Sequence, residues 1–211
     1  TGNEGLKVSV IKGLSLSIRP GTLTIIRGAS GSGKSTLMNI LSGIILPDEG
    51  EVLADSKRLN DLSESKRDAF RLQNVGYIFQ TFNLIGKLTI LENTVLPAVF
   101  SGGDSLHEKS DEALKILKSL GLEGTGNRFP HELSVGQQQR VAAARVILQE
   151  PALVLADEPT ASLDRLSAGI VRDMILSLKG KGAGIALASH DGIFSEKEAD
   201  HVIELKEVSH E

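Results

Sequence analysis

The sequence predicts an α/β fold with a mainly parallel sheet, and three observations support this prediction. A glycine-rich loop at 28–35 lies between an apolar strand pattern and a helix pattern. Strand and helix patterns alternate again after residue 150, which is typical of a parallel sheet. Helical patterns dominate between about 90 and 149. We therefore expect one domain over 1–211, with a core at 1–84 and 151–211 and an inserted helical subdomain at 85–150.

The first half of the sequence predicts short strands and helices that are separated by turns. Apolar residues alternate with serines at 14–18, which predicts a half-buried strand before the Pro20-Gly21 turn. The β-branched run at 23–26 predicts a buried strand directly before the glycine-rich loop. We expect strands at 14–18, 23–26, 51–53 and 75–79, and helices at 35–41 and 63–72.

The second half begins with helices and then alternates. Ser105 and Glu108 form a capping box that predicts the start of a helix ending at Gly121. A second helix stops before Pro151. The apolar run that follows is the pattern of a strand covered on both faces of a parallel sheet. We expect helices at about 105–121 and 136–149, a helix ending at Gly180, and strands at 152–156, 185–188 and 201–205.

The loop Gly28-Ala29-Ser30-Gly31-Ser32-Gly33-Lys34-Ser35 matches the phosphate-binding pattern G-x-x-x-x-G-K-S. Its glycines let backbone N–H groups curve around phosphate oxygens, and the helix N-terminus adds a partial positive charge. Lys34 would reach the β- and γ-phosphates, and the Ser35 hydroxyl would hold Mg²⁺. With Thr36 in the first helical turn, these residues predict a nucleoside triphosphate site.

Two acidic residues follow the apolar strand at 152–156. Asp157 and Glu158 stand at its carboxyl end, where open α/β sheets bind ligands. Asp157 can hold Mg²⁺ directly or through water, and Glu158 can poise a water for attack on the γ-phosphate. The alternative is that Asp-Glu-Pro is merely a turn or a helix start.

A second anion-binding helix terminus is predicted at 133–137. Ser134 is an N-cap candidate, Gly136 allows close backbone approach, and Gln137 follows them. This terminus has no lysine of its own, so it could hardly bind a triphosphate unaided. Three single polar residues, taken one at a time, are more often structural than catalytic: Gln80, Asp164 and His190.

Composition and charge exclude several other functions. The chain has 23 basic and 27 acidic residues and a net charge of −4, so no basic surface predicts a nucleic-acid partner. It has no cysteine, which excludes disulfides, thiolate metal sites and a cysteine nucleophile. No apolar run reaches the roughly 18 residues that a membrane-spanning helix needs.

In order along the chain, these motifs resemble those of the ATP-binding cassette (ABC) ATPases. The resemblance implies a P-loop NTPase core with an N-terminal antiparallel β portion and an inserted helical subdomain. The stretch 79–97 is most similar to ATPase subunits of lipoprotein-release and macrolide-efflux transporters. The matching motifs are the Walker A loop at 28–35, the Q-loop glutamine Gln80, the signature motif at 133–137, the Walker B strand at 153–157, the catalytic glutamate Glu158, the D-loop at 162–164 and the switch histidine His190.

The resemblance also implies a mechanism in which two identical cassettes pair head to tail around two ATP molecules. Within one site it assigns Lys34 to phosphate charge, Glu158 to the attacking water and His190 to the γ-phosphate. The Mg²⁺ ligands it implies are Ser35, Gln80 and Asp157. The residues it places at the nucleotide of the opposite subunit are Ser134, Gly136 and Gln137, and Asp164 is also expected at bound nucleotide.

A separate integral membrane permease is the other partner that the resemblance implies. It would dock near Gln80 and the helical insert, which would place this chain at the cytoplasmic face of the inner membrane. Four apolar residues are candidates for the docking groove or, equally, for core packing: Phe79, Phe82, Leu84 and Ile85. Two alternatives stay open, namely an ABC ATPase for transmembrane mechanical signalling or cell-division control, and a soluble ABC ATPase without a transport role.

The sequence departs from the family pattern at two places. Val135 replaces a signature-motif glycine, and a positive φ would strain this β-branched residue. We expect an ordinary φ there and retained activity. The family also places an aromatic residue ahead of the P-loop to stack on adenine, and 1–7 contains none. Either that aromatic lies upstream, or the base is held poorly.

Overall fold

The computed structural model describes residues 10–100, 106–161, 163–190 and 192–206. Its central sheet has five parallel strands in the order β4-β5-β6-β1-β7. The smaller sheet is an antiparallel pair, β2 (Leu53–Ala54) and β3 (Lys57–Arg58). The expected mainly parallel sheet with a small antiparallel portion is thus confirmed. The strands of the large sheet are β1 (Leu23–Arg27), β4 (Val75–Ile78), β5 (Leu153–Asp157), β6 (Gly184–Ala188) and β7 (His201–Glu204).

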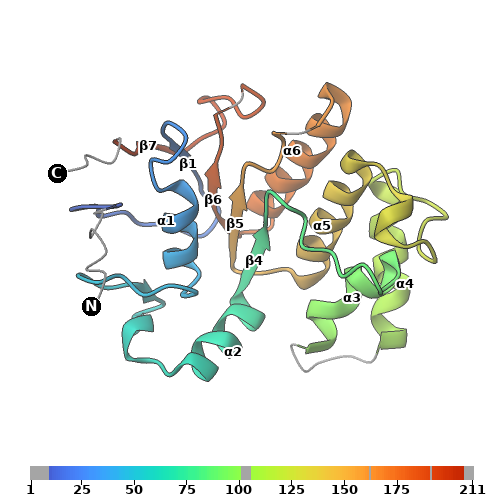
Figure 1. Ribbon diagram of the computed structural model, residues 1–211, viewed down its shortest axis with the longest axis horizontal. Helices are drawn as coiled ribbons and strands as arrows, with labels where there is room; N and C mark the ends of the chain where they lie inside the picture. The colour runs from blue at the N-terminus through green and yellow to red at the C-terminus, as the bar shows by residue number, and fades with distance from the viewer. Residues whose placement is uncertain (1–9, 101–105, 162, 191, 207–211) are drawn as a thin grey trace, which may run out of the picture.

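Helices cover both faces of the large sheet (Figure 1). On one face lies α1, and on the other lie α5 and α6. Two further helices, α3 and α4, pack with α5 to form a helical cluster. The helices are α1 (Lys34–Leu41), α2 (Glu64–Asn74), α3 (Ile90–Phe100), α4 (Leu106–Ser119), α5 (Val135–Gln149) and α6 (Arg165–Gly180), with short 3₁₀ turns at η1 (Leu59–Asp61) and η2 (Pro130–Glu132).

The two-sided cover explains why the strand sequences are almost continuously apolar. Leu23 and Ile25 of β1 join the core beneath α5 and α6, whereas Ile26 joins the core beneath α1. Each of these side chains is at most 1% exposed. Because both faces of the strand are buried, apolar residues are favoured at every position rather than at alternate ones.

The half-buried strand that we expect at 14–18 is not formed as a strand, so this prediction is wrong. The alternation itself is present, because Leu14, Leu16 and Ile18 pack against the core beneath α1 while the serines are exposed. No ladder pairs this stretch within the described ranges, and an open crevice separates it from the edge strand β7. Alternation of apolar and polar residues therefore indicates that one face of the segment is buried. A β-strand also requires a hydrogen-bonded partner strand, which this segment lacks in the described ranges.

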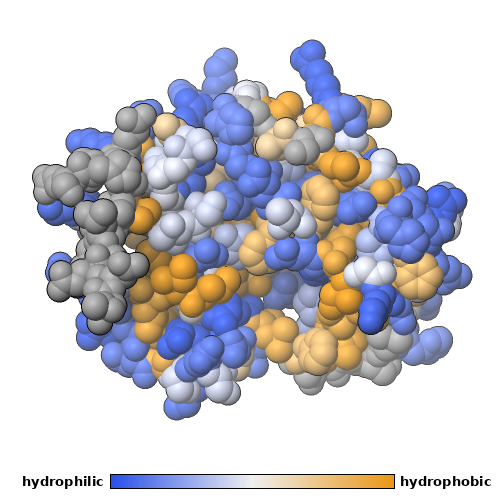
Figure 2. All heavy atoms as spheres, viewed as in Figure 1, coloured by the Kyte–Doolittle hydropathy of each residue, from blue (hydrophilic) through white to orange (hydrophobic). Residues whose placement is uncertain are grey.

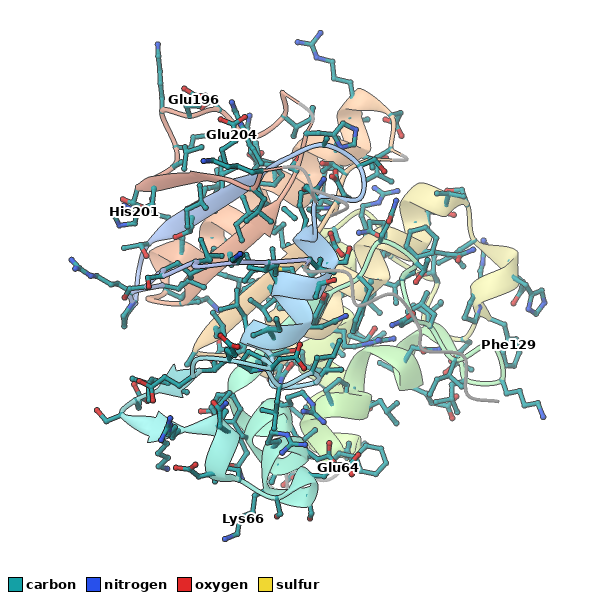
Figure 3. The ribbon with its side chains drawn as sticks, turned by 60° about the vertical axis from the view of Figure 1, so that its left-hand side comes forward. Glu64, Lys66, Phe129, Glu196, His201 and Glu204 are labelled. Atoms are coloured by element: carbon teal, nitrogen blue, oxygen red, sulfur yellow. The ribbon has the colours of Figure 1, made fainter. Side chains whose placement is uncertain are left out.

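The strand expected at 51–53 is displaced to Leu53–Ala54 and belongs to a hairpin. Asp55 and Ser56 make its turn with φ values of +47° and +65°, the left-handed pair that suits a two-residue hairpin loop. The exposed polar helix predicted at 63–72 is confirmed as α2, which buries none of its residues. Lys66 of α2 points away from the body of the protein, as does His201 of β7 (Figure 3), and both are exposed.

The remaining predicted helices and strands are confirmed, and their ends differ from the predicted ends by at most two residues. The helix after the glycine-rich loop is α1, and Gly43 beyond it has a φ of +70°. The helix with its buried stripe that ends before Gly121 is α4. The capping box predicted for its start includes Ser105, which lies outside the described residues. Of the helices described, none is both long and apolar enough to cross a membrane.

Gly76 provides a test of the packing between β4 and α5. A Cβ atom there would lie 2.5 Å from Val146 Cγ1 and 2.7 Å from Pro151 Cγ. Gly76→Ala should therefore lower the free energy of unfolding by about 1–3 kcal/mol. The matched control is Gly169 in α6, where a Cβ would meet nothing within 4 Å and alanine should stabilise by up to about 1 kcal/mol. Urea unfolding of both variants measures the difference, and equal changes would contradict this packing.

Candidate active site

Parallel pairing brings the carboxyl ends of three strands side by side. Ile26 of β1 and Asp157 of β5 are both paired with Ala188 of β6. The residues just beyond these pairs are the glycine-rich loop, Glu158 and His190. Ligands of open α/β sheets bind outside such strand ends, so the register alone gathers the predicted phosphate, carboxylate and histidine groups at one edge.

The glycine-rich loop has the backbone of a phosphate-binding loop. Gly28, Gly31 and Gly33 have φ values of +155°, +81° and +93°. At Gly33 a Cβ would lie 2.8 Å from Val10 Cγ1, so glycine is required for space as well as for conformation. Gly33 directly precedes α1 and makes no side-chain cap, which leaves the first N–H groups of this helix for an anion.

Lys34 folds back over this loop. Its Nζ donates to the carbonyl oxygens of Gly28 at 2.8 Å and Ala29 at 3.1 Å. The other predicted loop residues differ in exposure, with Ser32 buried and Ala29, Ser30 and Ser35 exposed. Ser32 Oγ is buried without a hydrogen-bond partner. The loop therefore carries one lysine that bonds back to it and one buried hydroxyl without a hydrogen-bond partner.

Glu158 is the point where the loop and the strand ends meet. Its side chain is 9% exposed, and Oε1 lies 2.8 Å from His190 Nδ1 and 4.0 Å from Lys34 Nζ. The second oxygen, Oε2, is buried without a hydrogen-bond partner. The backbone of Glu158 is left-handed, at φ +48°, and its N–H donates to Ala188 O at 2.9 Å. Lys34, Glu158 and His190 are thus one cluster with a carboxylate oxygen to spare.

The residues predicted to hold Mg²⁺ come from three elements. Asp157 ends β5 and is 7% exposed, Ser35 lies in the first turn of α1, and Gln80 lies in the turn after β4. Burial raises the pKa of Tyr77, and the charge of Asp157 on the neighbouring strand raises this pKa further. Within the described residues no hydrogen bond joins Gln80 to Ser35 or Asp157. Carboxylate, hydroxyl and amide oxygens fit the preference of Mg²⁺ for oxygen ligands.

The second predicted anion site is the N-terminus of α5. Ser134 caps this helix, and its Oγ accepts from Gln137 N at 3.3 Å while Gln137 Oε1 accepts from Ser134 N at 2.9 Å. Val135 opens the helix and does not have a positive φ, so the ordinary conformation expected there is confirmed. At Gly136 a Cβ would lie 3.0 Å from Ser167 Oγ, which shows how closely α5 approaches α6.

Asp164 acts as the N-cap of α6. Its carboxylate accepts from Leu166 N and Ser167 N, both at 3.0 Å, and from Ser167 Oγ at 2.7 Å. The hydrogen bond from the Ser167 hydroxyl, followed by that from its backbone, holds the pKa of Asp164 below its ordinary value. Ser167 also lies against Gly136, so the start of α6 and the start of α5 form one surface. Ser162 lies outside the described residues.

The segment between Gln80 and α3 contains a feature that sequence reasoning missed. Phe82 and Asn83 are both left-handed, with φ values of +58° and +48°, a conformation that costs about 1–3 kcal/mol for each such residue. The side chains that hold this segment are Arg145 of α5 and Asn93 of α3. The signal that could have revealed Arg145 is a lone cation within the apolar run 141–148.

The four apolar docking candidates divide between packing and exposure. Phe79 stacks on Tyr77 with ring centroids 3.8 Å apart, and Leu84 packs against the main core. Ile85 is 46% exposed. Figure 2 shows the apolar side chains on this face gathered in separate areas, one of them beside α3. Ile85 is therefore the candidate that is most available to a partner.

The fold and the site together define a P-loop ATPase with an inserted helical cluster. Residues 11–161 match the family model described as ABC transporter. The chain belongs to the ABC transporter family, as an ATP-binding domain.

Individual relatives agree with this assignment. The chain is 39% identical over 201 residues to the lipoprotein-releasing system ATP-binding protein LolD of Xanthomonas axonopodis pv. citri, covering 95% of this chain and 82% of that protein. It is 40% identical over 200 residues to the macrolide export ATP-binding/permease protein MacB of Mannheimia succiniciproducens, covering 95% of this chain but only 31% of that protein. A cassette solved as a dimer in a post-hydrolysis state with ADP and Pi superposes with a TM-score of 0.89 at 37% identity, covering 100% of this chain and 92% of that one.

Lys34 allows the loop assignment to be tested directly. Lys34→Ala removes the lysine that bonds back to the loop, so affinity for a non-hydrolysable ATP analogue should fall about 10- to 100-fold. The matched control is Lys181→Ala, because Lys181 is exposed and pairs with Glu150. Its affinity should equal that of the parent in the same calorimetric titration. Unchanged affinity in Lys34→Ala would contradict the loop assignment.

Proposed function

We propose that this chain is the ATP-hydrolysing subunit of a transporter and that it works as a pair of identical copies around two ATP molecules. The observation that carries the proposal is the position of Glu158, which shares one carboxylate oxygen with His190 and Lys34 and keeps the other unpaired. An unpaired, largely buried carboxylate oxygen can orient a water and accept its proton. The neighbouring cation and helix N-terminus can neutralise charge on the γ-phosphate.

The other roles follow from position around Glu158. Lys34 and the N–H groups of 28–36 bind the phosphates, and His190 contacts the γ-phosphate. Ser35, Gln80 and Asp157 hold Mg²⁺, which when bound neutralises phosphate charge. His190 is 68% exposed, so its free ring nitrogen remains available to substrate while Nδ1 stays at Glu158. Catalysis of this kind consists mainly of positioning and electrostatics.

The pairing of two copies is supported by where the second anion site lies. α1 covers one face of the sheet and α5 the other, and in the described part of the chain no hydrogen bond or ion pair links the P-loop to Ser134. The α5 terminus has no lysine, so it becomes useful when it faces a phosphate on another copy. Val135 and Leu166, which flank this surface, are 47% and 76% exposed. The related cassette solved as a dimer with ADP and Pi supports the same arrangement.

We also propose that the chain works with a membrane-embedded permease. The relatives LolD and MacB are named for lipoprotein release and macrolide export, and MacB carries ATP-binding and permease parts in one chain. We assign this chain to the cytoplasmic face of the inner membrane, with a separate permease docked at Ile85 and the helical subdomain 85–150. Export or lipoprotein release is then the transport that its ATP hydrolysis drives.

Glu158→Gln tests the catalytic assignment. The amide keeps the size of the side chain but cannot accept the proton of the attacking water, so kcat should fall about 10²- to 10⁴-fold while ATP still binds. Because ATP then persists between the copies, the variant should form a dimer with ATP and return to a monomer with ADP. Phosphate release and light scattering measure the two effects. Turnover at the parental rate would remove Glu158 from the mechanism.

Glu196→Gln is the matched control for that experiment. Glu196 is an exposed carboxylate that pairs with Arg27, and in the described residues it makes no hydrogen bond or ion pair with Lys34, Glu158 or His190. The same acid-to-amide change should leave both turnover and the monomer–dimer balance unaltered. A fall in turnover of comparable size in this variant would attribute the effect of Glu158→Gln to lost charge in general.

Co-purification tests whether a permease binds at the exposed loop residue Ile85. Full-length tagged chain isolated from detergent-treated membranes should bring down an integral membrane protein, identified by mass spectrometry. Ile85→Asp should reduce its recovery at least about tenfold because a charge at this apolar contact would be buried. Val202→Asp, on an equally exposed apolar residue of β7 that lies outside the helical subdomain, is the control that should retain it. Equal recovery with both variants would place the dock elsewhere.

A further inference from the structure

The segment after Gln80 is fastened to α3 by one buried amide. Asn93 is 0% exposed, and its Nδ2 donates to the carbonyl oxygens of Ile85, Leu88 and Thr89, each at 3.0 Å. Its Oδ1 accepts from Ile85 N at 2.8 Å. All of these partners are backbone groups, so Asn93 fixes the path of the loop irrespective of the side chains that the loop carries.

Arg145 of α5 continues this network. Its Nε donates to Asn93 O at 3.2 Å, its Nη1 to Asn83 O at 3.1 Å and its Nη2 to Asn93 Oδ1 at 3.4 Å. Burial lowers the pKa of Arg145, and no carboxylate forms an ion pair with it in the described ranges. Arg145 is half-buried, and the oxygens that it meets in the described residues all belong to the loop and to Asn93.

The same helix carries the second anion site. Arg145 lies ten residues after Val135, which corresponds to about 15 Å along a continuous α-helix. In Figure 1 the green segment after β4 runs across α5 before it enters α3. A displacement of the loop that pulls on Arg145 therefore acts on the helix that begins at Ser134.

A second connection leads to the same place. The first N–H groups of α3, those of Ile90 and Leu91, donate to Arg128 O at 2.8 Å and Gly126 O at 2.9 Å. The segment that contains these carbonyls runs directly into η2 and then Ser134. The end of the loop is thus attached to both the body of α5 and the chain that enters it.

We propose that Asn93 and Arg145 form a clasp that makes the loop 82–89 and α5 move as one body, so that the position of the loop fixes the position of Ser134 and Gly136. The inference rests on the proposed function, because this terminus acts only on a nucleotide held by a second copy. Both are positioning residues, since neither contacts the P-loop. The clasp also retains Phe82 and Asn83 in their left-handed conformations, which would relax on release.

The movement of the loop can be measured with spin labels. The chain has no cysteine, so Lys87→Cys in the loop and Lys115→Cys on α4 give two unique labelling sites, both exposed. In the full-length Glu158→Gln protein the distance distribution between them should be single and narrow. Arg145→Lys keeps the charge but loses the planar fork of donors. Asn93→Asp loses the amide N–H groups that face three carbonyl oxygens of the loop. Each should broaden or shift the distribution.

The effect on Ser134 is measured through dimer formation. In the same Glu158→Gln background, Arg145→Lys and Asn93→Asp should weaken the ATP-dependent dimer at least about tenfold. Affinity of the monomer for a non-hydrolysable ATP analogue should change less than about twofold, because the P-loop is untouched. The control is Thr94→Val, next to Asn93 and equally buried, whose hydroxyl donates to Ile90 O at 2.8 Å within its own helix. It should match the parent in every measurement.

Two results would overturn the clasp. One is a parental distance distribution in both clasp variants, and the other is parental dimer formation in variants whose loop has moved. If Arg145→Lys fails to bind the nucleotide analogue through misfolding, Asn93→Asp decides alone. If the Glu158→Gln parent itself forms no dimer with ATP, the pairing of copies is wrong. The spin-label distances then still decide whether the loop keeps its position relative to the helical cluster of α3, α4 and α5.

Discussion

The residue on which this site depends is Ala188, at the carboxyl end of β6. Its pairing with Ile26 and Asp157 puts the ends of β1, β6 and β5 in register, so that the glycine-rich loop, His190 and Glu158 leave neighbouring strands at the same level. Ala188 O also accepts from Glu158 N and holds that residue in a left-handed conformation. A slip of one residue between these strands would turn every side chain to the opposite face and disperse the cluster.

The same sheet separates the two anion-binding helix termini. A parallel sheet must be covered on both faces, and this chain uses α1 on one face and α5 with α6 on the other. The N-termini of α1 and α5 consequently belong to different layers. Ser134 forms a capping box with Gln137 in its own helix. Because the N-termini of α1 and α5 lie on opposite faces of the sheet, one chain supplies only half of each nucleotide site. We infer that the other half comes from an identical copy.

Local chemistry was predictable from the sequence wherever it involves neighbours along the chain. The P-loop between a strand and a helix, the cap at Ser134 and the ordinary φ of Val135 all depend on residues within a few positions. The strand expected at 14–18 fails because a ladder needs a distant partner. Arg145 was missed for a related reason: its acceptors lie 52 and 62 positions away and are backbone carbonyls, which every residue possesses.

Because Arg145 bonds to backbone carbonyl oxygens, an arginine suits position 145 better than a lysine would. A carboxylate partner would sit on a flexible side chain, so an ion pair could persist while the loop moved beneath it. A backbone carbonyl moves only with its own segment, and Arg145 bonds to that of Asn83 in the loop and to that of Asn93 in α3. Together with the Asn93 amide, these bonds fix the loop relative to α5. The planar guanidinium presents its donors in a rigid fork, whereas an ammonium on a flexible stem could follow either oxygen. Mechanical connection, rather than charge neutralisation, is therefore the role that we propose for this half-buried guanidinium, which forms no ion pair in the described part of the chain.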